Sequence, residues 1–476
     1  MLALLALLGT AGAASLDAVE VGGPWGTVLS DEPTALWWNP AGIASAGGTQ
    51  LLIEAAPTWG SVQFERGNPN GGADPLTSGG VVPFGGITSD LTVKGLGVGM
   101  AMAAPVARPG REVTPGGAGS YHLRSGEITK IHGIVGAAYE YKGIFALGAT
   151  VQLVSSTWAA EIDYDGLPDI VDELTELGIQ EVDGLDIDYT DEDLESDDYR
   201  VTLEFDHLKD TTVTWSLGAR VQPLEQLAFG FAYVAPYRVD NTGDTRLRFG
   251  CPSQDDVVGR YGLESFGLCD ADGGGRTLDA SGIIGYDLPA RFHFGVMGKP
   301  IEALRLEIFG AYITWSRFTD FDITIEDIAE KNTFDTALQK ERTPALTQQK
   351  RQWARDNVNT FLLALDTKYT ISPMWLVGAR VTYDKSAIPD PVLSTNNYDA
   401  NLFILMAHAA VNPVPPLRIG LSFSEYLASV RQVEDSAFGM TLDPATRKPD
   451  RYNYPQMRGT YGSSVHRVGL SATLKL

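Results

Sequence analysis

Long apolar runs are absent from this sequence. No stretch of about 18 uninterrupted apolar residues occurs, which excludes a membrane-spanning helix but not membrane-spanning strands. Hydrophobic residues make up 44% of the chain, and the mean hydropathy is −0.06. A barrel wall that alternates apolar and polar side chains gives the same averages as an ordinary globular protein, so composition leaves both classes open.

Positive charge is also scarce. The chain has 36 Lys and Arg against 60 Asp and Glu, which gives a net charge of −24 and a pI near 4.6. A protein that binds nucleic acid needs a basic surface. We therefore expect no nucleic-acid partner.

Cysteine is limited to Cys251 and Cys269, which stand close together in a segment rich in Gly and Asp. In an exported protein such a pair is expected to form one disulfide within a loop. No other Cys or His stands nearby at ligand spacing. The sequence thus predicts neither a metal site nor a cofactor.

Catalytic motifs are missing as well. There is no G-x-S-x-G nucleophile elbow, and the six histidines are scattered. His293 falls on the polar face of a strand, where it could line the lumen. The G-L-G-V-G run at residues 95–99 does not fit a G-x-G-x-x-G nucleotide loop. Glycines at every second position instead keep one strand face bare for a close backbone approach. We expect no enzyme, although spacing alone leaves open a Ser/His or Asp/His set at a barrel rim.

The start of the chain predicts export. Residues 1–8 are apolar and residues 9–14 are small, which is typical of a signal peptide over 1–14 with cleavage near Ala13 or Ala14. The usual basic residues are missing, because the first Lys or Arg is Arg66. The alternative is a short buried helix.

The strongest positive signal is alternation with period two. From 213 to 221 one face carries Val, Trp, Leu, Ala and Val, and the other carries Thr, Ser, Gly and Arg. Segments 225–236, 357–370, 373–384 and 465–476 alternate in the same way. Successive side chains of a strand point to opposite faces. These segments exceed the usual soluble strand of about 5 to 6 residues and suit a tilted membrane strand of about 9 to 11.

Connection lengths alternate along the chain. We expect strands near 48–64, 79–88, 91–105, 127–141, 144–158, 211–221, 225–236, 289–298, 302–316, 357–370, 373–384, 400–411, 416–428 and 465–476. Short links alternate with long ones, and the long ones include 159–210, 237–288, 317–356 and 429–464. Outer-membrane barrels have short periplasmic turns and long external loops. The pattern favours an all-β, transmembrane antiparallel barrel.

The long connections have their own composition. Residues 161–199 are rich in Asp and Glu and contain no Lys or Arg before Arg200. A solvated acidic loop is one interpretation, and a site for bridging divalent cations is the other. Spacing of apolar residues predicts a short helix over Leu167–Leu177, and a helix over Ala329–Arg355 is a further candidate.

The segment before the first strand carries the most specific motif. It contains Asp31-Glu32-Pro33-Thr34-Ala35-Leu36 followed by Trp37-Trp38-Asn39-Pro40-Ala41-Gly42. This resembles the hatch of the FadL family of outer-membrane transporters, whose pattern is D-P-[ST]-A-L-x-x-N-P-A-G. Glu32 stands where that pattern has Asp. Residues 288–290, 315–316 and 383–389 resemble the family more moderately, and the likeness spans the mature chain.

The resemblance implies a domain plan and a set of site residues. It implies a hatch over 15–47 that plugs a barrel over 48–476, and about fourteen strands, the number placed above with this family in view. The hatch residues expected to act are Trp37, Trp38, Asn39, Pro40 and Ala41. The amide of Asn39 could tie the hatch to the wall, although an ordinary turn is the simpler alternative. The glycines expected to kink a strand beside a lateral opening are Gly95, Gly97 and Gly99.

The function implied is passive uptake across the bacterial outer membrane. The resemblance implies a channel for long-chain fatty acids or aromatic hydrocarbons, with an internal apolar site and a lateral exit. Alternatives are a general porin, an adhesin or structural barrel that uses acidic external loops, and a rim enzyme. Expected partners are a hydrophobic small molecule and outer-membrane lipid with lipopolysaccharide, and we expect a monomer.

Overall fold

The computed structural model describes residues 20–67, 73–112, 124–165, 200–251, 275, 277–326, 349–395, 397–434, 436, 440–442, 449–452 and 458–476. The expected signal peptide 1–14, the expected helix Leu167–Leu177 and Cys269 lie outside these residues. No helix in the described part is long and apolar enough to cross a membrane.

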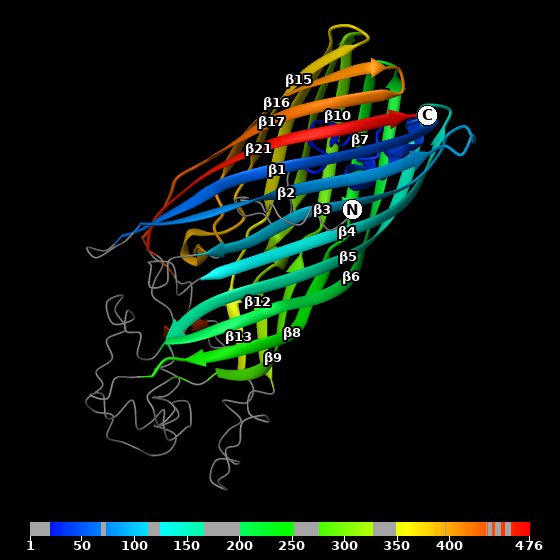
Figure 1. Cartoon of the computed structure of the whole chain (residues 1–476). Helices are drawn as coiled ribbons and strands as arrows, with labels where there is room; N and C mark the ends of the chain where they lie inside the picture. The colour runs from blue at the N-terminus through cyan, green and yellow to red at the C-terminus, as the bar shows by residue number, and fades with distance from the viewer. Residues whose placement is uncertain are drawn as a thin grey trace.

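One closed antiparallel sheet forms the wall of a barrel (Figure 1). Its strands are β1 (Thr49–Arg66), β2 (Ala73–Ser89), β3 (Leu96–Glu112), β4 (Ser125–Tyr141), β5 (Phe145–Asp165), β6 (Arg200–Leu224), β7 (Leu227–Val234), β8 (Tyr237–Phe249), β9 (Thr277–Leu288), β10 (Arg291–Ile301), β11 (Leu304–Ile313), β12 (Asp320–Glu326), β13 (Gln349–Ala354), β14 (Thr360–Thr370), β15 (Trp375–Asp384), β16 (Leu402–Val414), β17 (Leu417–Ala428), β18 (Arg431–Val433) and β21 (Gly459–Lys475). Strands β19 (Met440–Leu442) and β20 (Pro449–Tyr452) form a separate two-stranded sheet.

Fourteen wall strands close the barrel, as expected from the sequence. The last strand, β21, pairs with the first, β1, with Gln50 opposite Lys475. Five wall strands are interrupted, so β7 continues as β8, β10 follows β9, β12 follows β11, β14 follows β13 and β18 follows β17. Pro236 and Pro289 stand at two of these interruptions. Proline lacks the N–H that a strand ladder needs, so it ends regular pairing there.

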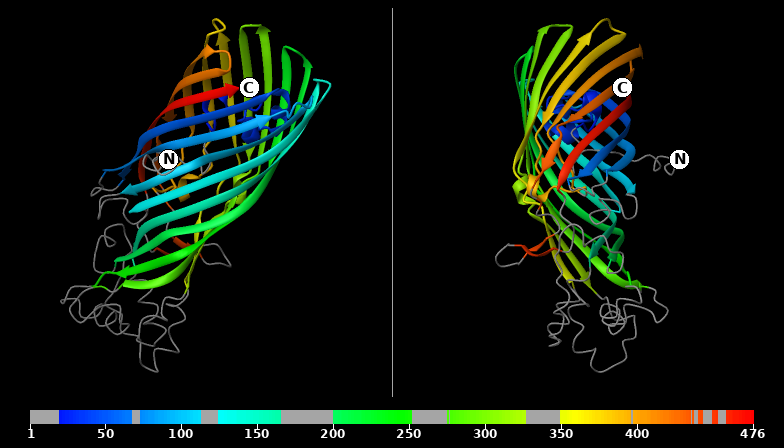
Figure 2. Two further views of the ribbon diagram at one scale, coloured as in Figure 1. Left: turned by 45° about the vertical axis from the view of Figure 1, so that its right-hand side comes forward. Right: turned by 90° about the vertical axis from the view of Figure 1, so that its left-hand side faces the viewer.

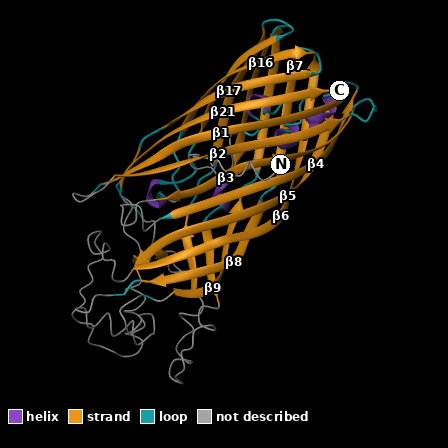
Figure 3. Cartoon of the chain, viewed as in Figure 1, coloured by secondary structure: helices purple, strands orange, loops and turns teal. Residues whose placement is uncertain are grey.

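The inside of the barrel holds the segment that precedes β1. It contains the 3₁₀ turn η1 (Gly23–Trp25), the helix α1 (Ala35–Trp38) and the 3₁₀ turn η2 (Pro40–Ser45). Figures 2 and 3 show these turns within the wall, nearer to the end of the barrel where the C-terminus lies. We refer to residues 20–47 as the hatch.

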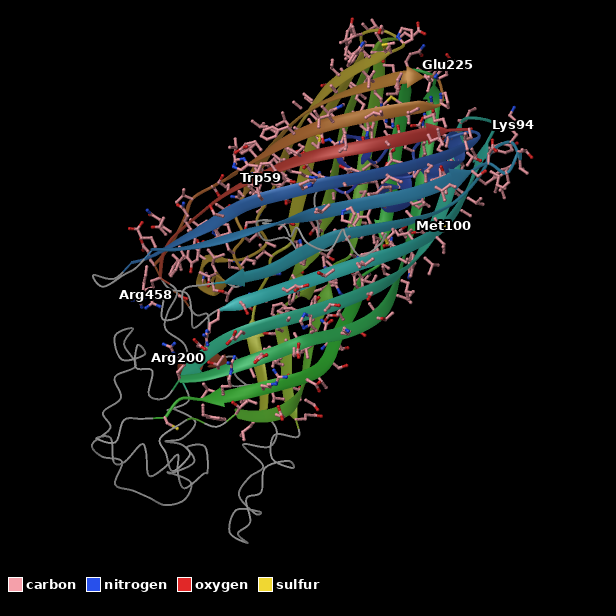
Figure 4. The ribbon with its side chains drawn as sticks, viewed as in Figure 1. Trp59, Lys94, Met100, Arg200, Glu225 and Arg458 are labelled. Atoms are coloured by element: carbon pink, nitrogen blue, oxygen red, sulfur yellow. The ribbon has the colours of Figure 1, made fainter. Side chains whose placement is uncertain are left out.

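Side chains of the wall alternate between lipid and lumen. On β5, Leu147, Val151 and Leu153 are about half exposed, whereas Thr150 and Gln152 are buried. Figure 4 shows Trp59 of β1 and Met100 of β3 projecting from the outer surface in the same way. Outward apolar side chains with inward polar ones are what a barrel in lipid requires.

An aromatic row marks one edge of the apolar belt. Neighbouring rings lie 5.1 to 6.5 Å apart between centroids where measured, and Tyr312 and Phe361 are cross-strand partners. The row runs across β6 to β16 through Trp215, Tyr233, Phe292, Tyr312, Phe361, Tyr383 and Phe403. Aromatic girdles sit at the membrane interface, so the membrane ends along this row.

The barrel continues beyond the aromatic row. There the outward side chains of β8 are charged, with Arg238 bound to Asp322 at 2.7 Å and Arg246 to Glu204 at 3.1 Å. The inward side chains of β8 are buried, and they are apolar at Val239 and Leu247 and polar at Asn241 and Thr245. This extension therefore has a charged outer face around a mixed, partly apolar interior, at the lower end of Figure 1.

The opposite end of the barrel has short turns. The β4–β5 hairpin turns through Lys142 and Gly143, with φ values of 55° and 69°, and Ile144 N–H donates to Tyr141 O over 3.1 Å. Two central residues with positive φ define the tight hairpin turn that matches strand twist. Short turns are typical of the periplasmic side, so the extension faces outward from the cell.

Several expected loops contain strand. Strand β8 and strand β9 lie within the expected loop 237–288, β12 and β13 lie within 317–356, and β6 begins inside 159–210. The expected helix Ala329–Arg355 is wrong at its end, because Gln349–Ala354 is strand β13. Outside the bilayer the outward face need not be apolar, so the alternation that revealed the membrane strands is weaker there.

Candidate functional site

Side-chain hydrogen bonds and one proline give the hatch its fold. Asn39 is extended and its Oδ1 accepts the Ala41 N–H over 3.2 Å, which caps η2, while Pro40 occupies the first position of the turn. Proline suits that position because its N–H would be unpaired there. Trp38 Nε1 donates to Val21 O at 2.9 Å and Thr34 Oγ1 donates to Trp25 O at 2.7 Å, so the two ends of the segment are tied together.

The expected hatch residues all contact the wall. Asn39 Nδ2 donates to the Ala219 carbonyl of β6 over 3.1 Å. Trp37 packs beneath the Arg291 guanidinium at 4.8 Å and against the His132 ring at 5.0 Å. All four of these side chains are buried, and Trp37 is only 1% exposed.

His293 has a neighbour that the sequence did not indicate. Its Nδ1 donates to the Trp38 carbonyl over 2.7 Å, and its ring lies 5.3 Å from the Trp38 ring. The histidine on the polar strand face thus lines the lumen, where it supports the hatch.

Bare glycines line the wall beside η2. A Cβ on Gly97 of β3 would come 2.5 Å from Ile43 O, and one on Gly148 of β5 would come 2.5 Å from the Pro40 carbonyl carbon. A Cβ on Gly218 of β6 would come 2.1 Å from Asn39 Oδ1. Only glycine lets two backbones approach so closely. The hatch is therefore seated directly on the backbone of these strands.

Buried ion pairs hold the other side of the hatch. Arg467 of β21 donates to Glu20 in the hatch and to Glu54 of β1, and both N–O distances are 3.0 Å. Tyr426 of β17 also donates its hydroxyl to Glu20 over 2.7 Å. The Arg467 side chain is 2% exposed, so these charges interact in a medium of low polarity.

Two further arginines, on β15 and β17, extend this set around the wall. Arg380 of β15 pairs with Asp366 at 3.0 Å and donates to the Gly23 and Pro24 carbonyls. Arg418 of β17 pairs with Glu32 and lies 3.6 Å above the Trp25 ring.

Glu307 of β11 accepts two hydrogen bonds from the hatch. It accepts from Thr27 Oγ1 and Leu29 N–H, each over 2.9 Å, while Arg305 donates to Leu29 O over 2.8 Å. Sequence inspection missed these residues, although a charged residue at an inward strand position was a usable signal.

An aromatic cluster lines the lumen of the outward extension. Trp158, Tyr286, Phe318 and Phe321 form it, with centroid distances of 4.8 to 5.8 Å. Leucine, isoleucine and valine side chains from β6, β8, β9 and β12 complete this buried apolar region. An apolar region therefore lies on the outward side of the hatch, and buried polar side chains such as Lys130 and Asn241 also face inward from the strands around it.

The connection between β15 and β16 folds inward on the same side. Ala387 packs in the apolar region of the aromatic cluster, and its neighbour Ile388 packs in a second cluster with Phe64 and Tyr461. Arg431 of β18 holds the connection through Asp390 Oδ1 at 2.9 Å and Asp399 O at 2.8 Å. Burial raises the pKa of the Asp399 carboxyl, although the Ala387 N–H hydrogen bond acts in the opposite direction.

The ladder between β2 and β3 is incomplete. It runs from Ser89 opposite Val98 to Phe84 opposite Ala103 and ends there, although both strands continue. Strand β3 also shifts register on β4 between Ala103 and Val106. Pro83 and Pro105 flank the last pair, and neither offers a backbone N–H.

The interruption begins beyond the expected glycines. Gly99 still pairs with Thr88, and Gly97 pairs with Ala138 on the other side. Gly95 adopts a φ of 80° in the turn before β3. The glycines of β3 thus face the hatch, and the break in pairing lies several residues further along the strand.

Cys251 is disulfide-bonded. It follows β8 at the outer end of the barrel and packs at the edge of the apolar region around the aromatic cluster. The other cysteine of the sequence, Cys269, lies outside the described residues.

Comparison with known families decides the assignment. The model of the family described as outer membrane protein transport protein (OMPP1/FadL/TodX) matches residues 2–446. The chain belongs to this family. It is a transport protein of the bacterial outer membrane. A search of curated proteins by sequence finds no match.

Solved structures of OMPP1/FadL/TodX proteins share the fold. A Pseudomonas aeruginosa FadL homologue has a TM-score of 0.73 at 17% identity, covering 98% of this chain and 100% of that one. The toluene transporter TodX of Pseudomonas putida has a TM-score of 0.64 at 13% identity, covering 97% and 99%. The monoaromatic hydrocarbon channel CymD has a TM-score of 0.61 at 14% identity, covering 99% and 98%.

Proposed function

We propose that this barrel is a passive channel for hydrophobic small molecules. Fatty acids and aromatic hydrocarbons are the two candidate classes, because solved relatives include a FadL homologue, a toluene transporter and a monoaromatic hydrocarbon channel. Transport of this kind needs no covalent chemistry, so we assign no catalytic residue. The cargo would be held by the aromatic cluster, where burial of apolar area contributes about 25 cal/mol per Å².

The hatch argues against a general porin. Leu36 and Trp37 are fully or almost fully buried, so the hatch fills the lumen at its level. Water-filled porins instead leave an open aqueous channel. A molecule that passes this level must leave through the wall or displace part of the hatch.

The observation that carries the proposal is the unpaired stretch of β2 and β3. Beyond Phe84 and Ala103 the wall lacks its ladder next to the strand that supports the hatch. An apolar molecule leaving there enters the lipid without crossing a polar compartment. We infer a lateral exit between β2 and β3, beyond the glycines of β3.

A cross-link across the break tests this exit. Pro83→Cys with Ala104→Cys occupies the next position that the ladder would take, and a short thiol cross-linker joins the two strands. Ile87→Cys with Met100→Cys is the control, because these residues already pair and both face outward. Uptake of an apolar probe should fall after cross-linking of the first variant only. Equal uptake in both would remove the lateral exit.

The membrane contacts complete the proposal. The aromatic row would sit at the outer lipid interface, and the charged outer face around Arg238 would contact the polar part of lipopolysaccharide. A single chain forms the closed wall, the glycines on which the hatch rests and the break in the β2–β3 ladder. We therefore propose a monomer.

A further inference from the structure

Three polar side chains form a hydrogen-bonded chain on the outer face of the wall. Glu425 of β17 and His466 of β21 are cross-strand partners, and Glu425 Oε2 lies 2.6 Å from His466 Nδ1. The other ring nitrogen, Nε2, lies 3.2 Å from Ser464 Oγ, two residues earlier on the same strand. Alternate residues of a strand share a face, so the serine, the histidine and the carboxylate stand side by side on the outer surface.

The carboxylate fixes the tautomer of the histidine. A carboxylate only accepts hydrogen bonds, so His466 Nδ1 carries the proton that Glu425 accepts. The neutral ring then presents a lone pair at Nε2, to which the Ser464 hydroxyl donates. A hydroxyl that is hydrogen-bonded to a base, with the base oriented by a third group, is the arrangement by which serine hydrolases activate their nucleophile on unrelated folds.

The three side chains lie at the level of the outer lipid interface. The aromatic row ends at Phe403 of β16, whose partner on β17 is Leu427, and Leu427 is itself opposite Ser464. Trp59 of β1 is opposite His466, with ring centroids 5.8 Å apart, and projects outward (Figure 4). At an aromatic girdle the surface passes from lipid to water, so a serine here has acyl chains on one side and water on the other.

The surface around Ser464 suits an acyl ester. Phe423 and Leu470, on the membrane side, are about half exposed and offer an apolar surface to an acyl chain. Gly462 shares the strand face of Ser464 on the other side, and nothing lies within 4 Å of its Cβ position, which leaves room for the rest of the lipid. Ser61 of β1 is the cross-strand partner of Ser464, close enough for its hydroxyl to donate to the ester carbonyl oxygen.

We propose that Ser464, His466 and Glu425 form a second site, which hydrolyses acyl esters of lipids at the outer interface. Ser464 is the nucleophile, His466 is the general base, and Glu425 is a positioning residue. Glycerophospholipids and lipopolysaccharide both carry the long-chain acyl ester that this site recognises. The activity is separate from transport, which we place in the lumen, and does not depend on it.

The reaction balances with water as its only co-reactant. Ser464 Oγ attacks the ester carbonyl carbon while His466 Nε2 takes the hydroxyl proton. The bond from that carbon to the alcohol oxygen then breaks, and His466 gives the proton to the leaving alcohol. In the second step His466 takes a proton from water, whose oxygen attacks the acyl carbon. The bond to Oγ breaks, Oγ receives the proton, and the fatty acid leaves. Glu425 stabilises the charged ring that forms in both steps.

Release of labelled fatty acid tests this activity. Purified protein in mixed micelles receives radiolabelled glycerophospholipid in one arm and radiolabelled lipopolysaccharide in the other. Ser464→Ala and His466→Ala should each lower release at least about 100-fold. Ser155→Ala on β5 is the matched control, because Ser155 is also exposed but its cross-strand partners are Ile131 and Thr211. It should keep the wild-type rate, and heat-modifiable migration shows that each variant is folded.

Glu425 has a readout that a merely structural role would not give. Glu425→Gln should lower kcat with little change in KM, because the carboxylate acts through His466 and not on the lipid. Glu425→Asp should restore part of the rate. A fluorophosphonate, which bonds to activated serines, should modify Ser464 in wild type and leave it unmodified in His466→Ala.

The outcomes separate the lipid source from the site itself. Release from either lipid, lost in Ser464→Ala and kept in Ser155→Ala, supports the site and identifies its substrate. No release by wild type from either lipid would overturn the proposal. Equal release by wild type and Ser464→Ala would also overturn it, because the hydrolysis would then come from another group or a contaminating enzyme.

Discussion

Arg467 of the last strand lies between two carboxylates, Glu20 of the hatch and Glu54 of the first strand, at 3.0 Å from each. One side chain therefore fastens the hatch at the place where the barrel closes. Arg467→Met should destabilise the folded barrel by about 3 to 5 kcal/mol, because both carboxylates lose a buried partner. The unfolding temperature, followed by heat-modifiable migration on gels, measures the loss.

Arg467→Lys is the matched control for that variant. Lysine keeps the charge but lacks the planar fork that reaches two acceptors, so its unfolding temperature should fall between wild type and Arg467→Met. An unchanged temperature for Arg467→Met would mean that the contact does not hold the hatch.

Asn39 should hold the hatch on β6, and separate substitutions remove one or both of its two hydrogen bonds. Asn39→Ala removes both the bond to Ala219 O and the cap on Ala41 N–H, a loss of about 1 to 2 kcal/mol. Asn39→Asp keeps the cap acceptor but faces the Ala219 carbonyl without an amide donor. Ala41 is fully buried, so a maleimide should label an Ala41→Cys thiol faster in both Asn39 variants than with Asn39 intact. Identical labelling rates in all three proteins would mean that Asn39 does not hold the hatch on β6.

Gly148 should tolerate no side chain. A Cβ there would lie 2.5 Å from the Pro40 carbonyl carbon, so Gly148→Ala must push the hatch off β5. We expect destabilisation of about 1 to 3 kcal/mol, the usual cost of overpacking. Gly298→Ala is the control, since nothing lies within 4 Å of its Cβ position. Equal unfolding temperatures for the two variants would contradict the close seat.

The inward connection between β15 and β16 should respond to pH. Burial raises the pKa of Asp399 above its ordinary value of 3.8. The Asp399 carboxyl binds its proton more tightly when the connection is docked than when it is undocked. Burial of the neutral carboxyl therefore stabilises docking fully below pH 3.8, and this contribution declines as the pH rises through the raised pKa. Hydrogen exchange of residues 385–395, corrected for its intrinsic pH dependence, should show easier opening at higher pH.

Asp399→Asn supplies the control. The amide oxygen can still accept from Ala387 N–H but cannot ionise, so the part of the pH dependence that Asp399 contributes should disappear. The same pH dependence in this variant would assign the effect to another group.

Sequence alone predicted the wall where lipid imposes a pattern. Trp215 and Leu217 face the bilayer, and their alternation with Ser216 placed the membrane part of β6, although the strand begins earlier, at Arg200. Strand β8 was missed because Arg238 and Asp240 face water on its outer side, which removes the apolar face. The hatch motif indicated a contact of Asn39 with the wall, which the structure places at Ala219.

The ionic side of the site could not be found from the sequence. Arg467 and Glu54 are separated by 413 positions and meet only because β21 closes on β1. The break in the β2–β3 ladder likewise depends on register, since Pro83 and Pro105 become neighbours of one gap only after the strands pair. The local sequence pattern predicts which face of a strand is apolar and how long the strand is. These contacts depend instead on how the strands pair when the barrel closes.

The most direct test compares two fluxes through the purified protein. It is inserted into vesicles whose outer leaflet is lipopolysaccharide, and entry of radiolabelled dodecanoate or toluene is followed beside entry of a sugar of similar mass. The account predicts faster entry of at least one apolar probe and no faster entry of the sugar than in protein-free vesicles. Rapid sugar entry, or apolar entry no faster than without protein, would contradict it.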